Sequence, residues 1–354
     1  MLEPQRTNLV THSQDIENFN SITTLTVTPN AGISPSGKND AFKLTHTNSA
    51  GRIAQSGNAV SLSVGDYVTA SIWVKNISQT QITFSFFDMQ NVFTSGLDVT
   101  DQVRTDEWTR VTFIYEVTQA TSSWQMQFAR GGVDTGNEIL VWNPQLEIGQ
   151  YATSDILTNG STVTRLADVC NNAGDSTIFN DAEGVLFAEI NGLANESTGW
   201  NAISLNDSTH DDSIGIAWVL GSDTQMRFLV RSGGVGQMLY LPDVLKSEYH
   251  KVAIKYKAND FAVWIDGYEA HTDNVGVVPT GLNAISFDRG DGSDIFHGNT
   301  RQVLYFNEAL SDAELERLTS SDITQVLRNY NRRGELLGAT YESTHVQTKL
   351  NELF

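Results

Sequence analysis

The residues best suited to bind a ligand in this sequence lie around Trp200. Sugar binding needs a flat aromatic ring beside hydrogen-bonding groups, because a pyranose presents an apolar C–H face and a polar rim. Trp200 is followed directly by Asn201 and, a few residues later, by Asn206, in a segment whose sequence is typical of a loop. We predict that these three residues bind carbohydrate. The alternative is that Trp200 packs at the edge of a folded domain.

A second group of side chains could bind a cation. Asp288, Asp291 and Asp294 are separated by glycine, serine and one arginine, Arg289. Calcium takes about six to eight oxygen ligands, so these aspartates are the best local candidates for a calcium site, and calcium is the one cofactor considered. An ordinary polar turn is the competing interpretation, because Gly-Asp-Gly text is also typical of turns.

Catalytic motifs are not found in the sequence. It contains no Gly-x-Ser-x-Gly motif, no phosphate-binding glycine loop ahead of a helix and no His-Glu-x-x-His motif. A glycosidase would need a pre-organised pair of carboxylates, whereas the aspartates that lie closest together in this sequence fall in segments typical of loops. We therefore expect a protein that is not an enzyme. A polysaccharide depolymerase or glycosidase is the alternative.

Composition limits the partners of the chain. Its formal net charge is −20, which disfavours nucleic acid and anionic lipid, because affinity for both comes largely from Lys and Arg. Cys170 is the only cysteine, which excludes an intrachain disulfide. No apolar run approaches the ~20 residues that span a bilayer, and the first residues lack the pattern of a signal peptide. We expect neither a nucleic-acid nor a membrane partner.

Short alternating runs must position these groups. In Tyr67–Val74 every second residue is apolar, and Trp108–Tyr115 and Trp124–Phe128 repeat the pattern. Such runs, separated by turn residues, predict the strands of a β-sandwich. We expect the tryptophans in strand-like text to lie in the core: Trp73, Trp108, Trp218 and Trp264.

Three segments resemble a phage tail-protein module. Leu2–Leu9 and Trp142–Ser154 are similar to its two ends, and Thr162–Cys170 is similar to the connector that follows it in tail and tail-fibre proteins. That module resembles carbohydrate-binding jelly rolls. The resemblance implies a jelly roll over residues 1–155 and a connector over residues 156–180.

The region 181–320 resembles a different sandwich. Its segments Tyr249–Tyr256 and Asp260–Gly267 are similar to the central hairpin of laminin-G-like, concanavalin-A-like lectin domains. The segment Arg301–Leu315 is similar to their closing strand and short helix, with Ser311 and Glu314 as a capping box. The predicted fold class is all-β, with two β-sandwich (jelly-roll) domains in tandem and a short C-terminal helical tail.

The tail, residues 321–354, is predicted to be helical and to serve assembly or anchoring. Its apolar residues suit a docking surface: Leu336, Leu337, Tyr341, Val346, Leu350, Leu353 and Phe354. In the similar phage proteins the Leu2–Arg6 motif follows a virion-attachment region, so we expect the tail to perform assembly here, within a homotrimer or another symmetric oligomer. Packing back onto the second sandwich is the alternative.

The resemblance implies a function on the surface of a bacteriophage virion, for a protein made in the host cytoplasm. We expect a non-enzymatic tail-fibre, receptor-binding or capsid-decorating component. Its expected partners are other virion proteins and host-surface carbohydrate. A purely architectural protein that recognises no sugar is a further alternative.

Overall fold

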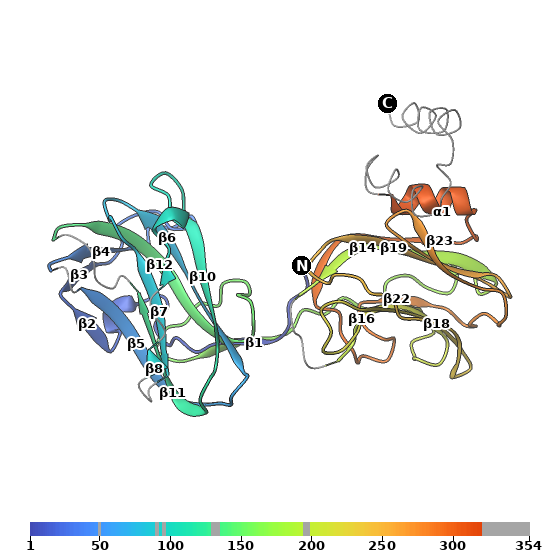
Figure 1. Ribbon diagram of the computed structural model, residues 1–354, viewed down its shortest axis with the longest axis horizontal. Coiled ribbons are helices and arrows are strands. Elements are labelled where there is room, and N and C mark those ends of the chain that lie inside the picture. Colours follow the sequence, from blue (N-terminus) through green and yellow to red (C-terminus); the bar gives the residue numbers. More distant parts are fainter. Residues whose placement is uncertain (49–50, 89–91, 94–96, 129–134, 194–198, 321–354) are drawn as a thin grey trace. The chain divides into compact units, whose positions relative to one another are not determined.

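A computed structural model describes residues 1–48, 51–88, 92–93, 97–128, 135–193 and 199–320. The chain divides into two compact units. The N-terminal sandwich comprises Pro4–Ala167, and the C-terminal sandwich comprises Met1–Glu3 together with the described residues of 168–320. Nearly all of the regular structure is antiparallel strand, so the predicted all-β fold with two sandwiches is confirmed (Figure 1).

The N-terminal sandwich consists of two antiparallel sheets. The first has the order β10 (Thr109–Glu116), β6 (Tyr67–Asn76), β12 (Glu138–Ile148), β4 (Phe42–His46), β3 (Leu25–Thr28). The second has the order β2 (Ser21–Thr23), β5 (Arg52–Leu62), β11 (Thr121–Phe128), β7 (Thr83–Asp88), β8 (Val92–Phe93), with β9 (Leu97–Asp98) also beside β7. Short 3-10 turns lie at Ile16–Asn18 and Thr100–Gln102.

Alternation along the strands fills the space between these two sheets. Ile72 and Val74 of β6 belong to the same buried cluster as Trp124, Met126 and Phe128 of β11. Burying each large apolar side chain contributes about 1.5–3 kcal/mol. The core of the N-terminal sandwich is therefore built from the residues that the alternating pattern selects.

The ends of the N-terminal sandwich are tied together. Strand β1 (Arg6–Asn8) pairs with β13 (Val163–Arg165). The stretch predicted as a connector, 156–180, is thus divided between the two units, because residues up to Ala167 belong to the N-terminal sandwich. The first resembling segment and the last one meet in this pairing.

Two of the tryptophans predicted to be core residues are not buried. Trp73 and Trp108 are half-buried, and each donates its indole N–H to an oxygen, of Asp155 at 3.1 Å and of Ile33 at 3.0 Å. Trp73 alternates with the buried Ile72 and Val74, so it lies on the outer face of its sheet.

The C-terminal sandwich also consists of two antiparallel sheets. One has the order β21 (Tyr268–Asp273), β20 (Phe261–Ile265), β19 (His250–Lys257), β14 (Glu183–Gly192), β23 (Gly298–Phe306). The other has the order β18 (Val235–Tyr240), β17 (Met226–Ser232), β16 (Ser213–Trp218), β15 (Asn201–Asn206), β22 (Ala284–Ser286). Trp218 is buried between the sheets, as predicted.

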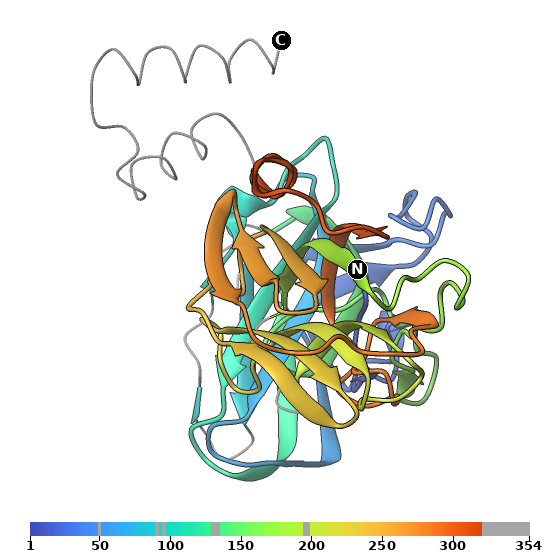
Figure 2. The same cartoon turned by 90° about the vertical axis from the view of Figure 1, so that its right-hand side faces the viewer.

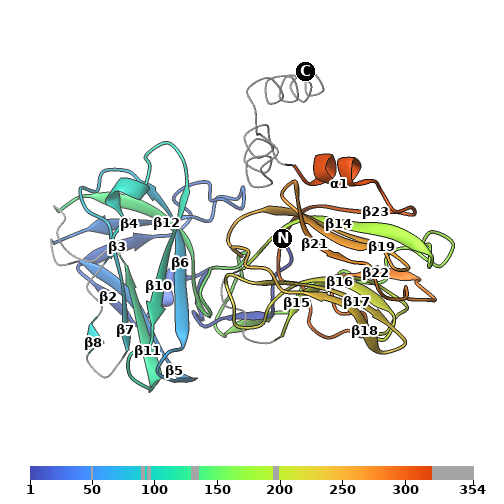
Figure 3. The same ribbon diagram turned by 45° about the vertical axis from the view of Figure 1, so that its right-hand side comes forward.

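Helix α1 (Asp312–Thr319) covers the outer face of the sheet that contains β14, β19 and β20 (Figures 2 and 3). Its Leu315 is fully buried in a cluster with Phe187 and with Trp264, which therefore lies under the helix and not between the sheets. The predicted capping box of Ser311 and Glu314 is present. The helix lies against one sheet, so the outer face of the β15–β18 sheet lies on the other side of this sandwich (Figure 3).

The tail residues predicted to mediate assembly lie outside the described residues: Leu336, Leu337, Tyr341, Val346, Leu350, Leu353 and Phe354. In the described part of the chain, no helix is both long and apolar enough to cross a bilayer.

Candidate functional site

The residues predicted to bind carbohydrate are separated by burial. Asn201 and Asn206 are not in a loop, because they begin and end strand β15. Their exposed fractions are 3% and 0%, and the Asn206 amide donates to Ser204 Oγ at 2.9 Å and accepts from the Ser208 N–H at 2.9 Å. Both asparagines are buried within the sandwich. Of the three predicted residues, only Trp200 is partly accessible.

Trp200 is held in place from two sides. Its backbone N–H donates to Asp294 Oδ1 at 3.1 Å, and the guanidinium carbon of Arg227 lies 4.0 Å from the centre of its ring. Such a stacked pair is a cation–π contact. Because one face of the ring is covered by Arg227, Trp200 does not present that face to a sugar.

The three aspartates of the predicted calcium site do not come together around a cation. Asp288 is 2% exposed and accepts from Asn171 Nδ2 and from the Gly290 N–H, both at 2.6 Å. Asp291 and Asp294 lie 2.7 and 3.4 Å from the guanidinium of Arg289. The hydrogen bond from Arg289 lowers the pKa of the Asp291 carboxyl.

Arg289 thus supplies a positive charge beside two of the three aspartates. A fixed guanidinium beside two carboxylates repels a second cation. Among the described residues no group of three or more acidic, histidine or cysteine side chains is placed to hold a metal. In the described residues the loop makes the hydrogen bonds of a polar turn, and a calcium site at these aspartates stays a prediction.

Basic side chains gather on this same face of the C-terminal sandwich. Arg227 and Arg231 lie on one side of β17, opposite Ala217 and Ser213 of β16. His210 is half-buried beside them. Burial lowers the pKa of His210, and the charges of Arg231, Arg289 and Arg227 lower it further, whereas the charge of Asp291 raises it.

A pocket of about 470 Å³ opens in the N-terminal sandwich. It is lined by residues from the first turn, from β5 and β11, and from the returning chain: Thr7, Leu9, Thr11, His12, Asn18, Asn20, Gln55, Ser56, Gly57, Val60, Trp124 and Thr162. The lining consists of hydroxyl, amide and imidazole groups with a few apolar side chains. No aspartate, glutamate, lysine or arginine is among these lining residues.

Internal hydrogen bonds fix the polar groups of the pocket. Gln55 Nε2 donates to Thr11 Oγ1 at 2.5 Å, and Thr11 Oγ1 lies 2.8 Å from His12 Nδ1. The Asn20 side chain makes two hydrogen bonds with the backbone of Ser56. Asn20 Oδ1 accepts from the Ser56 N–H at 2.7 Å, and Asn20 Nδ2 donates to the Ser56 carbonyl at 3.2 Å. Gln55 Oε1 is buried and has no hydrogen-bond partner in the part of the chain that the structure describes.

Trp124 forms the buried inner wall of the pocket and is 2% exposed. It pairs across the sheet with Gly57, where an added Cβ would lie 2.5 Å from Trp124 Cζ2. A glycine is therefore required opposite this ring, because real Cβ atoms do not approach a ring so closely.

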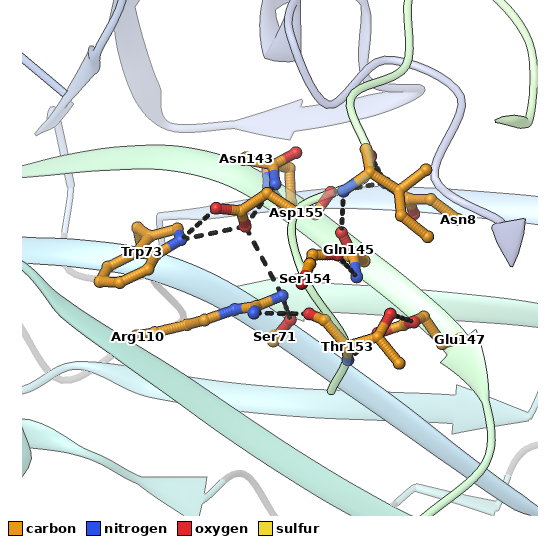
Figure 4. A network of polar contacts seen from close by, with 12 residues as sticks. Asn8, Ser71, Trp73, Arg110, Asn143, Gln145, Glu147, Thr153, Ser154 and Asp155 are labelled. Carbon is orange, nitrogen blue, oxygen red and sulfur yellow. Dashed lines mark hydrogen bonds and ion pairs between the residues drawn. The ribbon is translucent and has the colours of Figure 1, made fainter. Parts of the chain in front are cut away.

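The segments that resemble the phage module form a polar network on the outer face of the first sheet (Figure 4). Asn8 Nδ2 donates to the Ile156 carbonyl at 2.8 Å, and Asn8 Oδ1 accepts from the Leu146 N–H at 3.1 Å. Gln145 Oε1 accepts from the Ile156 N–H at 2.7 Å, and the fully buried Glu147 accepts from the Thr153 N–H at 3.0 Å. These motif residues fasten the returning chain to the sheet.

Sequence reasoning missed the arginine group and the pocket. Arg227 and Arg231 are four positions apart on a strand and so share a face, which is a readable signal. The pocket combines Thr7, Gln55, Trp124 and Thr162, and only the sheet order brings these distant segments together.

No family model and no curated protein sequence matches this chain. Among solved structures, the NanB sialidase of Streptococcus pneumoniae is similar over 43% of this chain and 28% of its own, at 13% identity and a TM-score of 0.35. The enzymatically active domain of tailspike protein 4 from bacteriophage CBA120 is similar over 40% of this chain and 21% of its own, at 18% identity and a TM-score of 0.31. Domains LG4-5 of the mouse laminin alpha1 chain are similar over 75% of this chain and 91% of their own, at 11% identity and a TM-score of 0.26. The first two likenesses thus span less than a third of the neighbour's length.

Proposed function

We propose that this chain is a non-enzymatic protein of a bacteriophage particle that binds host-surface carbohydrate through the pocket of its N-terminal sandwich. The observation that carries the proposal is the lining of that pocket. Its volume, about 470 Å³, falls in the range of small-molecule sites. Its neutral amides and hydroxyls match the hydroxyl rim of a sugar, and its apolar side chains match the C–H face.

The same lining supports binding without turnover. Hydrolysis of a glycosidic bond uses a pair of carboxyl groups beside the scissile bond. The residues that line this pocket include no carboxylic acid. A bound saccharide would therefore meet hydrogen-bonding groups and one imidazole, His12, but no acid/base pair.

The phage assignment is supported by the resembling segments. Leu2–Leu9, Trp142–Ser154 and Thr162–Cys170 are far apart in the sequence, yet the first meets the other two in the N-terminal sandwich, through the Asn8 hydrogen bond to Leu146 and the pairing of β1 with β13. A tail fibre, a receptor-binding protein or a capsid decoration would each use such a module. Other virion proteins would be its partners at the virion surface.

The experiment that tests this function is a glycan array read with two matched variants. Thr162→Trp places a large ring at the exposed rim of the pocket, whereas Ser161→Trp places the same ring on the exposed neighbouring residue, which does not line the pocket. We expect the wild-type protein and Ser161→Trp to bind the same neutral glycans and Thr162→Trp to lose them. Equal binding by all three proteins, or no bound glycan, would contradict the proposal.

Assembly is the second part of the proposal. We propose that residues 321–354 join the chain to identical subunits or to the virion. Removing these residues should lower the oligomeric mass in solution, measured by light scattering, and leave glycan binding intact. An unchanged mass would contradict this role.

A further inference from the structure

We propose that the outer face of β16 and β17 is a second binding site, which takes carboxylate groups of an acidic saccharide with Arg227 as the principal donor. This site lies in the C-terminal sandwich and differs in chemistry from the neutral pocket. It rests on the proposed function only in taking a saccharide as the carrier of the carboxylate.

Arginine side chains gather on this face of an acidic protein. Arg227 and Arg231 lie on one side of β17, and Arg289 lies in the loop that also holds Asp291 and Asp294. The carboxylates of Asp211, Asp291 and Asp294 offset the charges of Arg231 and Arg289, so the attraction of this face for an anion depends on Arg227.

The three guanidiniums are not equally neutralised by the protein. Arg289 is paired with both Asp291 and Asp294. Arg231 donates to the Gly234 carbonyl at 2.5 Å and lies 3.7 Å from the largely exposed Asp211. Arg227 has no carboxylate within ion-pair distance among the described residues; burial lowers its pKa and the nearby charge of Asp294 raises it. The Nε atoms of all three arginines are buried without a hydrogen-bond partner in the described part of the chain, so this atom does not distinguish Arg227.

Arg227 is oriented for a planar anion. The guanidinium carbon lies 4.0 Å from the centre of the Trp200 ring, so this cation–π contact restrains the guanidinium. A stacked guanidinium keeps its N–H donors in its own plane, where a carboxylate accepts two parallel hydrogen bonds. Trp200, the residue that the sequence predicted to contact the sugar, thus acts here as a positioning residue for the donor.

The open space beside Arg227 is confined to Gly215, because Ser213, Ala217 and Leu229 on the same face are buried. Gly215 of β16 pairs with Leu229 of β17, midway between Arg227 and Arg231. A Cβ added to Gly215 would meet no atom within 4 Å, so space lies above it. Arg227 and Arg231 are separated by about 13 Å along the strand, at ~3.3 Å per residue, so two carboxylates of one oligosaccharide could reach them.

The test measures binding of oligogalacturonate and oligosialic acid by titration calorimetry, with their neutral methyl esters as isosteric controls. We expect at least one acid form to bind and its ester not to bind. Arg227→Gln should weaken that binding at least about tenfold, because hydrogen bonds to a charged group are lost. Arg227→Lys should give an intermediate affinity, because it keeps the charge without the planar donor pair.

A matched control separates the site from the overall charge. Arg301 also lies over an aromatic ring, 3.8 Å from the centre of Tyr249, so Arg301→Gln makes the same change elsewhere in this sandwich. We expect Arg301→Gln to bind as the wild type does. Equal effects of the two substitutions, equal binding of acid and ester, or no binding of either acid would overturn the inference.

The Thr162→Trp variant keeps this inference apart from the proposed function. It should bind the acidic oligosaccharides as the wild type does. Loss of acidic binding in Thr162→Trp but not in Arg227→Gln would overturn the second site and leave the pocket standing. Loss of neutral glycans alone would support both.

Discussion

Arg110 joins three residues in the polar network of the N-terminal sandwich. It donates to the Thr153 carbonyl at 2.6 Å and to Ser71 Oγ at 3.0 Å, and lies 3.6 Å from Asp155 (Figure 4). Arg110→Met keeps the apolar stem and removes the donors. We expect the free energy of unfolding to fall by about 2 kcal/mol, because charged hydrogen bonds are lost and their buried acceptors remain.

Arg104 supplies the control for this measurement by urea unfolding. It forms an ion pair with Glu107 in which both side chains are largely exposed, 67% and 63%. Arg104→Met should change the free energy of unfolding by less than about 0.5 kcal/mol, because exposed ion pairs contribute little. Equal losses in the two variants would show that the network does not stabilise this sandwich.

His250 predicts a pH dependence of stability. Its Nδ1 lies 2.6 Å from Asp266 Oδ2 and its Nε2 lies 2.9 Å from the Leu245 carbonyl, so both nitrogens face acceptors. Burial opposes the charged form, but the hydrogen bond and charge of Asp266 outweigh it and raise the pKa of His250. A raised pKa in the folded state stabilises the fold below the ordinary histidine pKa, and this stabilisation is lost as the pH rises through the folded-state pKa.

Asp266→Asn tests this sign. Asp266 has a positive φ of 49°, which asparagine tolerates, so the backbone of the turn should be kept. We expect the urea midpoint of the wild type to fall from about pH 6 upward, and to fall less steeply in the variant. Parallel pH profiles would contradict the assignment.

At the residue scale, the sequence indicated which residues matter better than it indicated their hydrogen-bond partners. The motif around Gln145 and Glu147 was found as a family resemblance, but its physical role depends on Asn8 and Thr153, and Asn8 is more than a hundred positions from Gln145. Asn201 and Asn206 were placed wrongly in a loop because asparagine is common in loops, whereas both are buried on β15 and the Asn206 amide donates to Ser204 Oγ. A short stretch of sequence does not reveal hydrogen-bond partners that lie far away along the chain.

At the element scale, α1 shows what a short apolar helix does for a sheet. The capping box was predictable because Ser311 and Glu314 are three positions apart. The face that the helix covers was not, because Trp264 and Phe187 lie on separate strands.

Leu315→Ala measures the contribution of this helix. The side chain is fully buried against the sheet, so we expect a loss of about 2–5 kcal/mol in the free energy of unfolding, measured by urea. Ser311→Ala, at the exposed cap, should cost only about 1 kcal/mol. A smaller effect at Leu315 than at Ser311 would contradict packing of the helix on the sheet.

At the scale of the whole molecule, two separate hydrophobic cores predict two unfolding transitions. The N-terminal and C-terminal sandwiches each bury their own apolar cluster. In calorimetry, Arg110→Met should lower the midpoint of one transition and Leu315→Ala the midpoint of the other. Both substitutions shifting one common transition would show that the units unfold together.

The all-β architecture and the division into two sandwiches were predictable because alternation and turn residues are local signals. The pocket and the arginine face were not, because each needs the register between strands. The function proposed here therefore depends on surfaces that exist only in the folded chain.

The measurement that tests the account most directly is titration of host-surface polysaccharide into the wild-type protein, Thr162→Trp and Ser161→Trp, followed by mass analysis of the recovered glycan. We predict saturable binding by the wild type and Ser161→Trp, reduced binding by Thr162→Trp and an unchanged glycan chain length. New reducing ends, or equal binding by all three proteins, would contradict a neutral pocket that holds carbohydrate without converting it.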